Sequence, residues 1–439
     1  MDTKHFESIQ LDLDIRRLLV ANPSIGTKTS KGIISALQYS SNEQKKELRK
    51  WLRENLAVFK KKTKEYDTPA LQMKLYEQVN KHIDQWEEEF GEVSLSDLHL
   101  LTVQTDIKLV DIGWRLGKIS PASIAKLLDE YIVGQEPFKQ AIGQTLDNHI
   151  ARMHYPDKNL PKENQLSFGS SGTGKTSGVI IPADLLNINW GIVNCERVQP
   201  EGIQGPKLSD PCVRALGNKE DNMIMIFDEV DKIKNEEVRN ELLSYLDDKN
   251  MISFPTTFGV YREYKEIPSG NITCILCGKF EALTEAVKKR LNMNRVGFSA
   301  GDQKNLSIEE LYALVNMDDL KQVLGSEDLC GRIGNFVGLR PLNADDLVTI
   351  MLYKKESIFS RYNAYFSIRN AKLELTKDGA QEIADITIKK YKDLGARGLE
   401  IVIRQLLKEP MFNIDKFRGK CITIDKGYVT TQLKDIITN

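Results

Sequence analysis

The fold is decided by one stretch of the sequence, which reads Gly169-Ser170-Ser171-Gly172-Thr173-Gly174-Lys175-Thr176. It fits the pattern G-x-x-x-x-G-K-[ST] at every fixed position, and it lies between a strand-like segment and a helix-like one. Glycines let backbone N–H groups wrap a phosphate without side-chain clashes, and a following helix adds a favourable dipole. We therefore predict a nucleotide-binding loop that extends to Ser177. Lys175 is expected to reach the β- and γ-phosphates, and the Thr176 hydroxyl to bind Mg²⁺.

A second motif ends the apolar run at residues 223–227 with Asp228 and Glu229, followed by Val230 and Asp231. A buried strand that delivers acids at its carboxyl end suits a metal site at the edge of a parallel sheet. We predict that Asp228 holds Mg²⁺, directly or through water, and that Glu229 is the general base toward the attacking water. Alone, such a run also fits a surface acidic turn. Together with the glycine loop, it indicates nucleotide hydrolysis.

The pattern of apolar residues along the sequence divides the chain into three regions. Residues 1–118 read as an all-helical domain of unknown role, without a chemical motif. From residue 119, apolar runs at residues 165–168, 223–227 and 272–276 alternate with helical stretches, which predicts a mostly parallel sheet covered on both faces. From residue 339, helical patterns dominate until residues 421–429, interpreted as a late strand or hairpin. The expected fold is therefore α/β: a P-loop large domain at 119–338, then a small, mostly helical lid at 339–439.

Composition excludes some classes of protein. The formal net charge is -1, from 61 basic and 62 acidic residues, which argues against a globally basic nucleic-acid binder. We find no apolar run long enough to span a bilayer and no secretory start, so no membrane partner is expected. The six cysteines are scattered, which favours free thiols in the cytoplasm. Cys274 and Cys277 lie three apart in a strand-like run, point to opposite faces, and are interpreted as core residues rather than zinc ligands.

Further motifs point to a family. Residues 128–135 read Leu-Asp-Glu-Tyr-Ile-Val-Gly-Gln, residues 228–232 read Asp-Glu-Val-Asp-Lys, and residues 395–399 read Gly-Ala-Arg-Gly-Leu. These segments resemble those of AAA+ ATPases of the ClpX and HslU type, and the resemblance covers roughly residues 120–430. It implies that ATP is the nucleotide, that Ile132 and Val133 contact the adenine, and that Arg397 touches the phosphates from a small-domain helix.

The same resemblance implies an assembly. Residues 331–333 resemble the site that supplies an arginine finger to the neighbouring subunit, which makes Arg332 a catalytic candidate and Arg340 its competitor. A cation that arrives from the next protomer stabilises charge on the transferring phosphoryl group. Because such a finger needs a neighbour, the resemblance implies a homo-oligomer, a hexamer in this family. It also implies that ATP hydrolysis remodels or unfolds a protein substrate.

Departures from the family concern substrate and partner sites. Where the family places an aromatic pore residue between glycines, this sequence has Ile203 and Gln204. A possible dock for a ClpP-type peptidase is the tripeptide Val296-Gly297-Phe298, which also fits a chance apolar core segment. No cysteine-rich zinc-binding segment precedes the ATPase motifs. Residues 277–279, at the family's sensor-1 position, hold no Asn or Thr.

Two other functions remain open at the level of sequence. The chain could be an ATP-dependent regulatory scaffold that recruits a partner without threading, which the small pore residue favours. It could also be a DNA-linked AAA+ motor or loader. ATP-dependent unfolding of a tagged protein separates the first from an unfoldase, and nucleic-acid binding at low salt tests the second.

Overall fold

The computed structural model describes residues 45, 46, 50, 117–200, 203–216, 221–255, 264–293 and 306–434. The helical domain predicted for residues 1–118 lies almost wholly outside these ranges, and so does the tripeptide Val296-Gly297-Phe298. Residues Ile124–Asp184 and Ile188–Asn439 form one compact unit. The architecture below is that of this unit.

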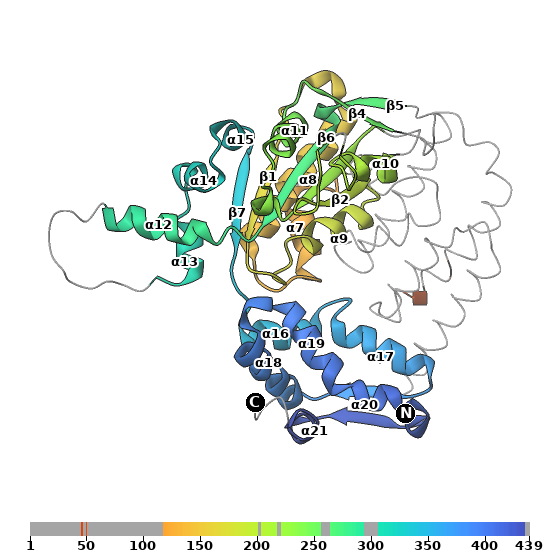
Figure 1. Ribbon diagram of the computed structural model, residues 1–439. Coiled ribbons are helices and arrows are strands. Elements are labelled where there is room, and N and C mark those ends of the chain that lie inside the picture. Colours follow the sequence, from red (N-terminus) through yellow and green to blue (C-terminus); the bar gives the residue numbers. More distant parts are fainter. Residues whose placement is uncertain are drawn as a thin grey trace. The chain divides into compact units, whose positions relative to one another are not determined.

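A five-stranded sheet forms the centre of the first part of this unit (Figure 1). Its strands all run parallel, in the order β2 (Trp190–Asn194), β3 (Met223–Asp228), β6 (Ile272–Gly278), β1 (Gln165–Gly169) and β7 (Asn335–Leu339). The three apolar runs of the sequence are β1, β3 and β6, and nearly all their residues are buried, as expected for a sheet covered on both faces. The α/β fold predicted from them is confirmed.

Helices and a hairpin surround this sheet. The helices are α7 (Pro121–Asp129), α8 (Glu136–His154), α9 (Ser177–Leu185), α10 (Asp210–Leu216), α11 (Glu236–Leu246), α12 (Ala282–Met293), α13 (Ile308–Ala313), α14 (Met317–Leu324) and α15 (Glu327–Gly331). Figure 1 shows the last three beside β7. The hairpin pairs β4 (Met251–Pro255) with β5 (Tyr264–Pro268) antiparallel. Pro182 lies inside α9.

The remaining part has its own hydrophobic core, which begins at Leu342. Its elements are α16 (Ala344–Tyr353), α17 (Ile358–Ile368), β8 (Lys372–Leu375), α18 (Lys377–Tyr391), α19 (Ala396–Leu406), α20 (Lys408–Phe412), β9 (Cys421–Ile424) and α21 (Lys426–Gln432). Of the late strand predicted at residues 421–429, residues 421–424 are confirmed as β9, whereas residues 426–429 belong to α21. The hairpin alternative is wrong, because β9 pairs in parallel with β8. Asp425, within the segment predicted as a strand or hairpin, caps α21: its side chain accepts a hydrogen bond from the Tyr428 N–H.

The junction between the two parts is fixed by one glutamine. The Gln135 amide donates to the Arg340 carbonyl at 2.8 Å and accepts from the Arg340 N–H at 3.0 Å. The Arg340 guanidinium in turn binds both carboxylate oxygens of Asp346, at 2.5 and 3.0 Å, in the first turn of α16. The segment before α8 is thus connected directly to the start of the small domain.

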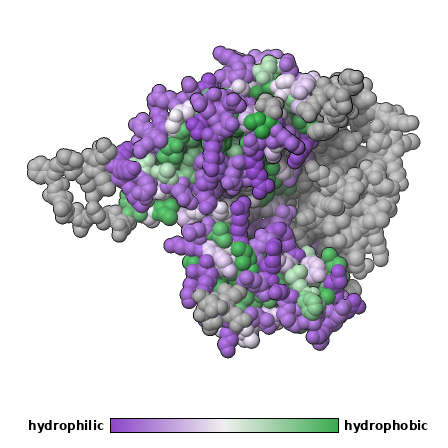
Figure 2. Space-filling model, in the orientation of Figure 1, coloured by the Kyte–Doolittle hydropathy of each residue, from purple (hydrophilic) through white to green (hydrophobic). Residues whose placement is uncertain are grey.

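The surface of this unit is mainly hydrophilic in the view of Figure 2, with scattered apolar residues. Within the ranges that the structure describes, we find no helix with the length and apolar character needed to cross a membrane.

Candidate nucleotide site

The glycine loop connects β1 to α9 and depends on its glycines at two close approaches. Gly169 and Gly172 have φ values of 142° and 68°, in the region that side chains rarely adopt. A Cβ atom at Gly169 would lie 2.5 Å from the Leu339 carbonyl oxygen, and one at Gly172 would lie 2.2 Å from that of Leu394. Glycine is therefore required here both for the turn and for contact with β7 and the small domain.

Lys175 is held inside this loop. Its ammonium donates to the carbonyl oxygens of Gly169 at 2.6 Å and Ser170 at 2.7 Å, and the side chain is buried. Burial lowers the pKa of Lys175, because a charged ammonium loses its hydration there. The Thr173 hydroxyl also donates to the Ser170 carbonyl, at 2.9 Å. The loop is thus a closed cradle with a cation at its base, as a phosphate site requires.

The two acids predicted to take part in hydrolysis lie at the carboxyl end of β3, next to the loop: Asp228 is its last residue, and Glu229 follows it. Asp228 accepts a hydrogen bond from the Glu229 N–H at 3.1 Å, and burial raises the pKa of its carboxyl group. Glu229 has a left-handed backbone, with φ 58°, so its side chain points in a different direction from that of Asp228. The Thr176 hydroxyl and the Asp228 carboxylate are the oxygen ligands that Mg²⁺ prefers. The residues at this edge therefore fit a magnesium ion.

Asn194, at the end of β2, was not identified from the sequence. Its amide donates to Glu229 Oε2 at 2.8 Å, because β2 pairs with β3 so that Asn194 lies opposite Asp228. A fixed hydrogen bond orients a carboxylate better than solvent does. Asn194 is therefore a positioning residue for Glu229, and only the strand order reveals it.

We expect Asn194→Ala to lower ATP turnover by roughly tenfold, since hydrogen bonds to charged groups are typically worth about 1.5–3 kcal/mol. The affinity for ATP should stay unchanged, because the side chain of Glu229, not the phosphate cradle, loses its partner. Steady-state kcat and equilibrium ATP binding measure the two effects separately. Equal losses in both would contradict a positioning role.

The third acid of the run has a structural task. Asp231 accepts hydrogen bonds from the backbone N–H groups of Lys279 at 3.3 Å and Phe280 at 3.4 Å. It thereby joins the acidic turn to the end of β6. A Cβ atom at Gly278 would lie 2.4 Å from Asp231 Oδ1, so this approach also depends on a glycine. Cys274 and Cys277 are buried within β6, and no group of metal-ligating side chains gathers in the described part of the chain.

One cavity of about 520 Å³ brings the predicted nucleotide residues together. That volume lies within the usual range of small-molecule sites. The lining includes most of the glycine loop, the acids at the end of β3, and residues of both domains: Ile132, Val133, Ser171, Gly172, Thr173, Gly174, Lys175, Thr176, Ser177, Asp228, Glu229, Asp231, Lys279, Leu342, Ile350 and Arg397. Arg397 comes from α19, whose Ala396 N–H donates to the Gly172 carbonyl at 3.1 Å. The small domain is thus bonded to the glycine loop.

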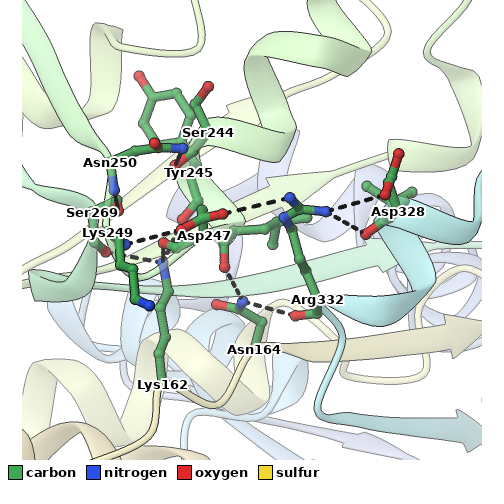
Figure 3. A network of polar contacts seen from close by, with 12 residues as sticks. Lys162, Asn164, Ser244, Tyr245, Asp247, Lys249, Asn250, Ser269, Asp328 and Arg332 are labelled. Carbon is green, nitrogen blue, oxygen red and sulfur yellow. Dashed lines mark hydrogen bonds and ion pairs between the residues drawn. The ribbon is translucent and has the colours of Figure 1, made fainter. Parts of the chain in front are cut away.

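The two candidate arginine fingers lie outside this lining. Arg332 precedes β7 by three residues, at the end of the sheet opposite the glycine loop, since Leu339 pairs with Gly169. Its guanidinium contacts the Asp328 carbonyl at 2.9 Å and Asp247 at 3.5 Å (Figure 3). Arg340 is bound to Asp346 at the domain junction. The role of either arginine toward a neighbouring subunit stays a prediction.

The predicted pore residues lie in a loop that does not line the nucleotide cavity. Ile203 is 53% exposed, and Gln204 is also exposed. The ammonium of Lys207 organises this loop from within, donating to the carbonyls of Pro200, of Ile203 at 2.6 Å and of Gln199 at 3.3 Å. The loop thus presents an apolar side chain to its surroundings, as several other segments of the described surface also do.

Comparison with known proteins gives the same picture. No family model matches the chain. It is 29% identical over 359 residues to the ATP-dependent Clp protease ATP-binding subunit ClpX of Treponema denticola, covering 75% of this chain and 84% of the relative. It is 27% identical over 340 residues to that of Porphyromonas gingivalis, covering 71% and 82%. The glycine loop, the acids at the end of β3, the lid arginine and this similarity identify the chain as a ClpX-like AAA+ ATPase.

Proposed function

We propose that this chain forms a homohexameric ring that hydrolyses ATP to unfold or remodel protein substrates. The observation that carries the proposal is the cavity in which the glycine loop, Glu229 and the lid residue Arg397 meet. Because the site is shared by two domains, a change in the bound nucleotide changes the contacts between them. An ATP-driven protein unfoldase requires such a dependence of domain contacts on the bound nucleotide.

The residues have distinct chemical tasks in this proposal. Mg²⁺ held by Thr176 and Asp228 would neutralise charge on the phosphates of ATP. Lys175 binds the β- and γ-phosphates, and Glu229, oriented by Asn194, accepts a proton from the attacking water. Arg397 senses the phosphates from the lid. Ile132 and Val133 provide the apolar wall for the adenine.

The junction suggests how hydrolysis moves the lid. Arg397 lies in the first turn of α19, where the Ala396 N–H is bonded to the glycine loop. Gln135, two residues after Val133, holds the backbone of Arg340 at the entry to the small domain. Release of phosphate removes a partner of Arg397 while the Gln135 clamp stays. We propose that the lid then rotates about this clamp.

Substrate and partner follow from the exposed segments. We propose that Ile203 and Gln204 contact the substrate polypeptide in the central channel, where the exposed Ile203 provides the apolar grip. The relatives are named as subunits of the Clp protease, which supports a ClpP-type peptidase as partner. Val296, Gly297 and Phe298, outside the described residues, remain the proposed dock. All six cysteines are free thiols, which suits the cytoplasm as the proposed compartment.

The test is ATP-dependent unfolding of a tagged fluorescent protein by the full-length chain. We expect loss of native fluorescence with Mg-ATP, and none with the Glu229→Gln variant, which should bind ATP without hydrolysing it. A wild-type chain that turns over ATP but leaves the tagged protein folded would exclude threading of that substrate. It would favour the regulatory scaffold instead.

A further inference from the structure

A network of polar contacts fixes the carboxyl end of α11 (Figure 3). The last carbonyl groups of a helix have no partner within the helix. Here the Lys162 ammonium donates to the carbonyls of Tyr245, of Asp247 at 3.1 Å and of Ser269 at 2.9 Å. The Asn164 amide donates to the Leu246 carbonyl at 2.8 Å. The end of α11 is therefore held rigidly against the segment that enters β1.

The same network fixes the backbone of Arg332. The Asn164 amide also donates to the Arg332 carbonyl at 2.9 Å, and its Oδ1 accepts from the Cys274 N–H at 3.2 Å. One asparagine thus connects the end of α11, the start of β6 and the residue that carries the guanidinium. These connections place Asp247, which directly follows α11, beside the Arg332 side chain.

Two partners hold the Arg332 guanidinium. Its Nη1 donates to the Asp328 carbonyl at 2.9 Å, and its Nη2 faces Asp247 Oδ2 at 3.5 Å. The other Asp247 oxygen accepts from the Lys249 N–H at 3.0 Å, which orients the carboxylate. Arg332 Nε is buried and has no hydrogen-bond partner among the described residues. The side chain remains 34% exposed, so part of the guanidinium is open to another molecule.

We propose that Asp247 is a positioning residue for Arg332 when that guanidinium serves the ATP site of the neighbouring subunit. The inference rests on the proposed function. A free arginine side chain loses rotamer freedom when it is immobilised at a site, and a side chain already held in place loses less. A carboxylate that fixes the guanidinium from its own subunit therefore raises the fraction of time for which the cation is correctly aimed.

The position of Asp247 also connects two ATP sites. Helix α11 begins at Glu236, shortly after the acids that serve the subunit's own nucleotide, and Asp247 follows its other end. The helix is capped at its start by Asn235, which accepts from the N–H groups of Glu237 and Val238. The capped helix is therefore the element through which a shift of the acidic turn would reach the partner of Arg332.

The test uses mixed rings of two full-length variants. The acceptor, Arg332→Ala, keeps an intact site but offers no finger; the donor, Glu229→Gln, keeps its finger but does not hydrolyse ATP. Each alone should be nearly inactive, and mixing should restore turnover at acceptor sites that face a donor. Adding Asp247→Asn to the donor should lower the recovered kcat by roughly three- to tenfold, with KM for ATP unchanged. Asp247→Glu should restore part of it.

Two further donors serve as controls. Asp328→Asn should have little effect, because Arg332 is bonded to the Asp328 carbonyl and the carboxylate is 3.8 Å away and 82% exposed. Asp415→Asn changes a surface ion pair with Arg418 in the small domain and should have none. Equal recovery with Asp or Asn at position 247 overturns the inference. No recovery with the unmodified donor, in rings confirmed by sedimentation, contradicts the role of Arg332 itself and the inference with it.

Discussion

The Glu229→Gln variant is expected to lose ATP turnover by roughly 100-fold or more while it binds ATP as the wild type does. General bases typically contribute about 10²–10⁴ in rate. Glutamine has the same shape as glutamate, and its carbonyl oxygen can still accept the hydrogen bond that Asn194 now donates at 2.8 Å. The glycine loop, Lys175 and Thr176 are unchanged. Turnover and equilibrium binding of ATP, measured on the same preparation, separate the two properties.

This result has a matched control in Asp231. Its carboxylate is bonded to backbone N–H groups at the end of β6, so Asp231→Asn should alter the local turn more than the chemical step. Its thermal unfolding temperature should fall, whereas that of Glu229→Gln should not. A Glu229→Gln variant with full turnover would show that another group activates the water.

Replacing Arg332 by Ala is expected to lower turnover by about 10³-fold, the lower end of the effect of an arginine finger. ATP binding by the variant should be preserved, because Arg332 lies at the far end of the sheet from its own subunit's glycine loop. The variant should also recover turnover when it is mixed with a subunit that supplies an intact arginine. Steady-state turnover over a range of mixing ratios measures this recovery.

Arg340 provides the comparison. Its guanidinium is bound to both oxygens of Asp346 at the junction, so Arg340→Ala should weaken the attachment of the lid within the same subunit. Mixing with intact subunits should therefore not rescue it. If Arg340→Ala were rescued by mixing and Arg332→Ala were not, the finger would be Arg340.

The strands and the site loop were predictable because their signals are local. The strands β1, β3 and β6 are continuous apolar runs, since both faces of the sheet are covered. The strands β2 and β7 were not recognised. Ile192 in β2 is 39% exposed, and Gly338 in β7 packs against Tyr312 and Phe168, so neither strand has an uninterrupted apolar pattern.

The less predictable parts depend on contacts between distant residues. The bond from Asn194 to Glu229 requires β2 to lie beside β3, and the contact of Asp247 with Arg332 joins residues far apart in the chain. The hairpin predicted within residues 421–429 was wrong for a local reason: residues such as Asp425 favour both turns and helix caps, and here the cap is formed.

The central claim is that the cradle around Lys175 binds ATP with magnesium. Equilibrium binding of ATP to the full-length protein, with and without Mg²⁺, tests it most directly, with Lys175→Ala as the paired variant. We predict saturable, magnesium-strengthened binding by the wild type and its loss in the variant, since the ammonium at the base of the loop is removed. A folded wild-type protein without affinity for ATP in magnesium would contradict the account.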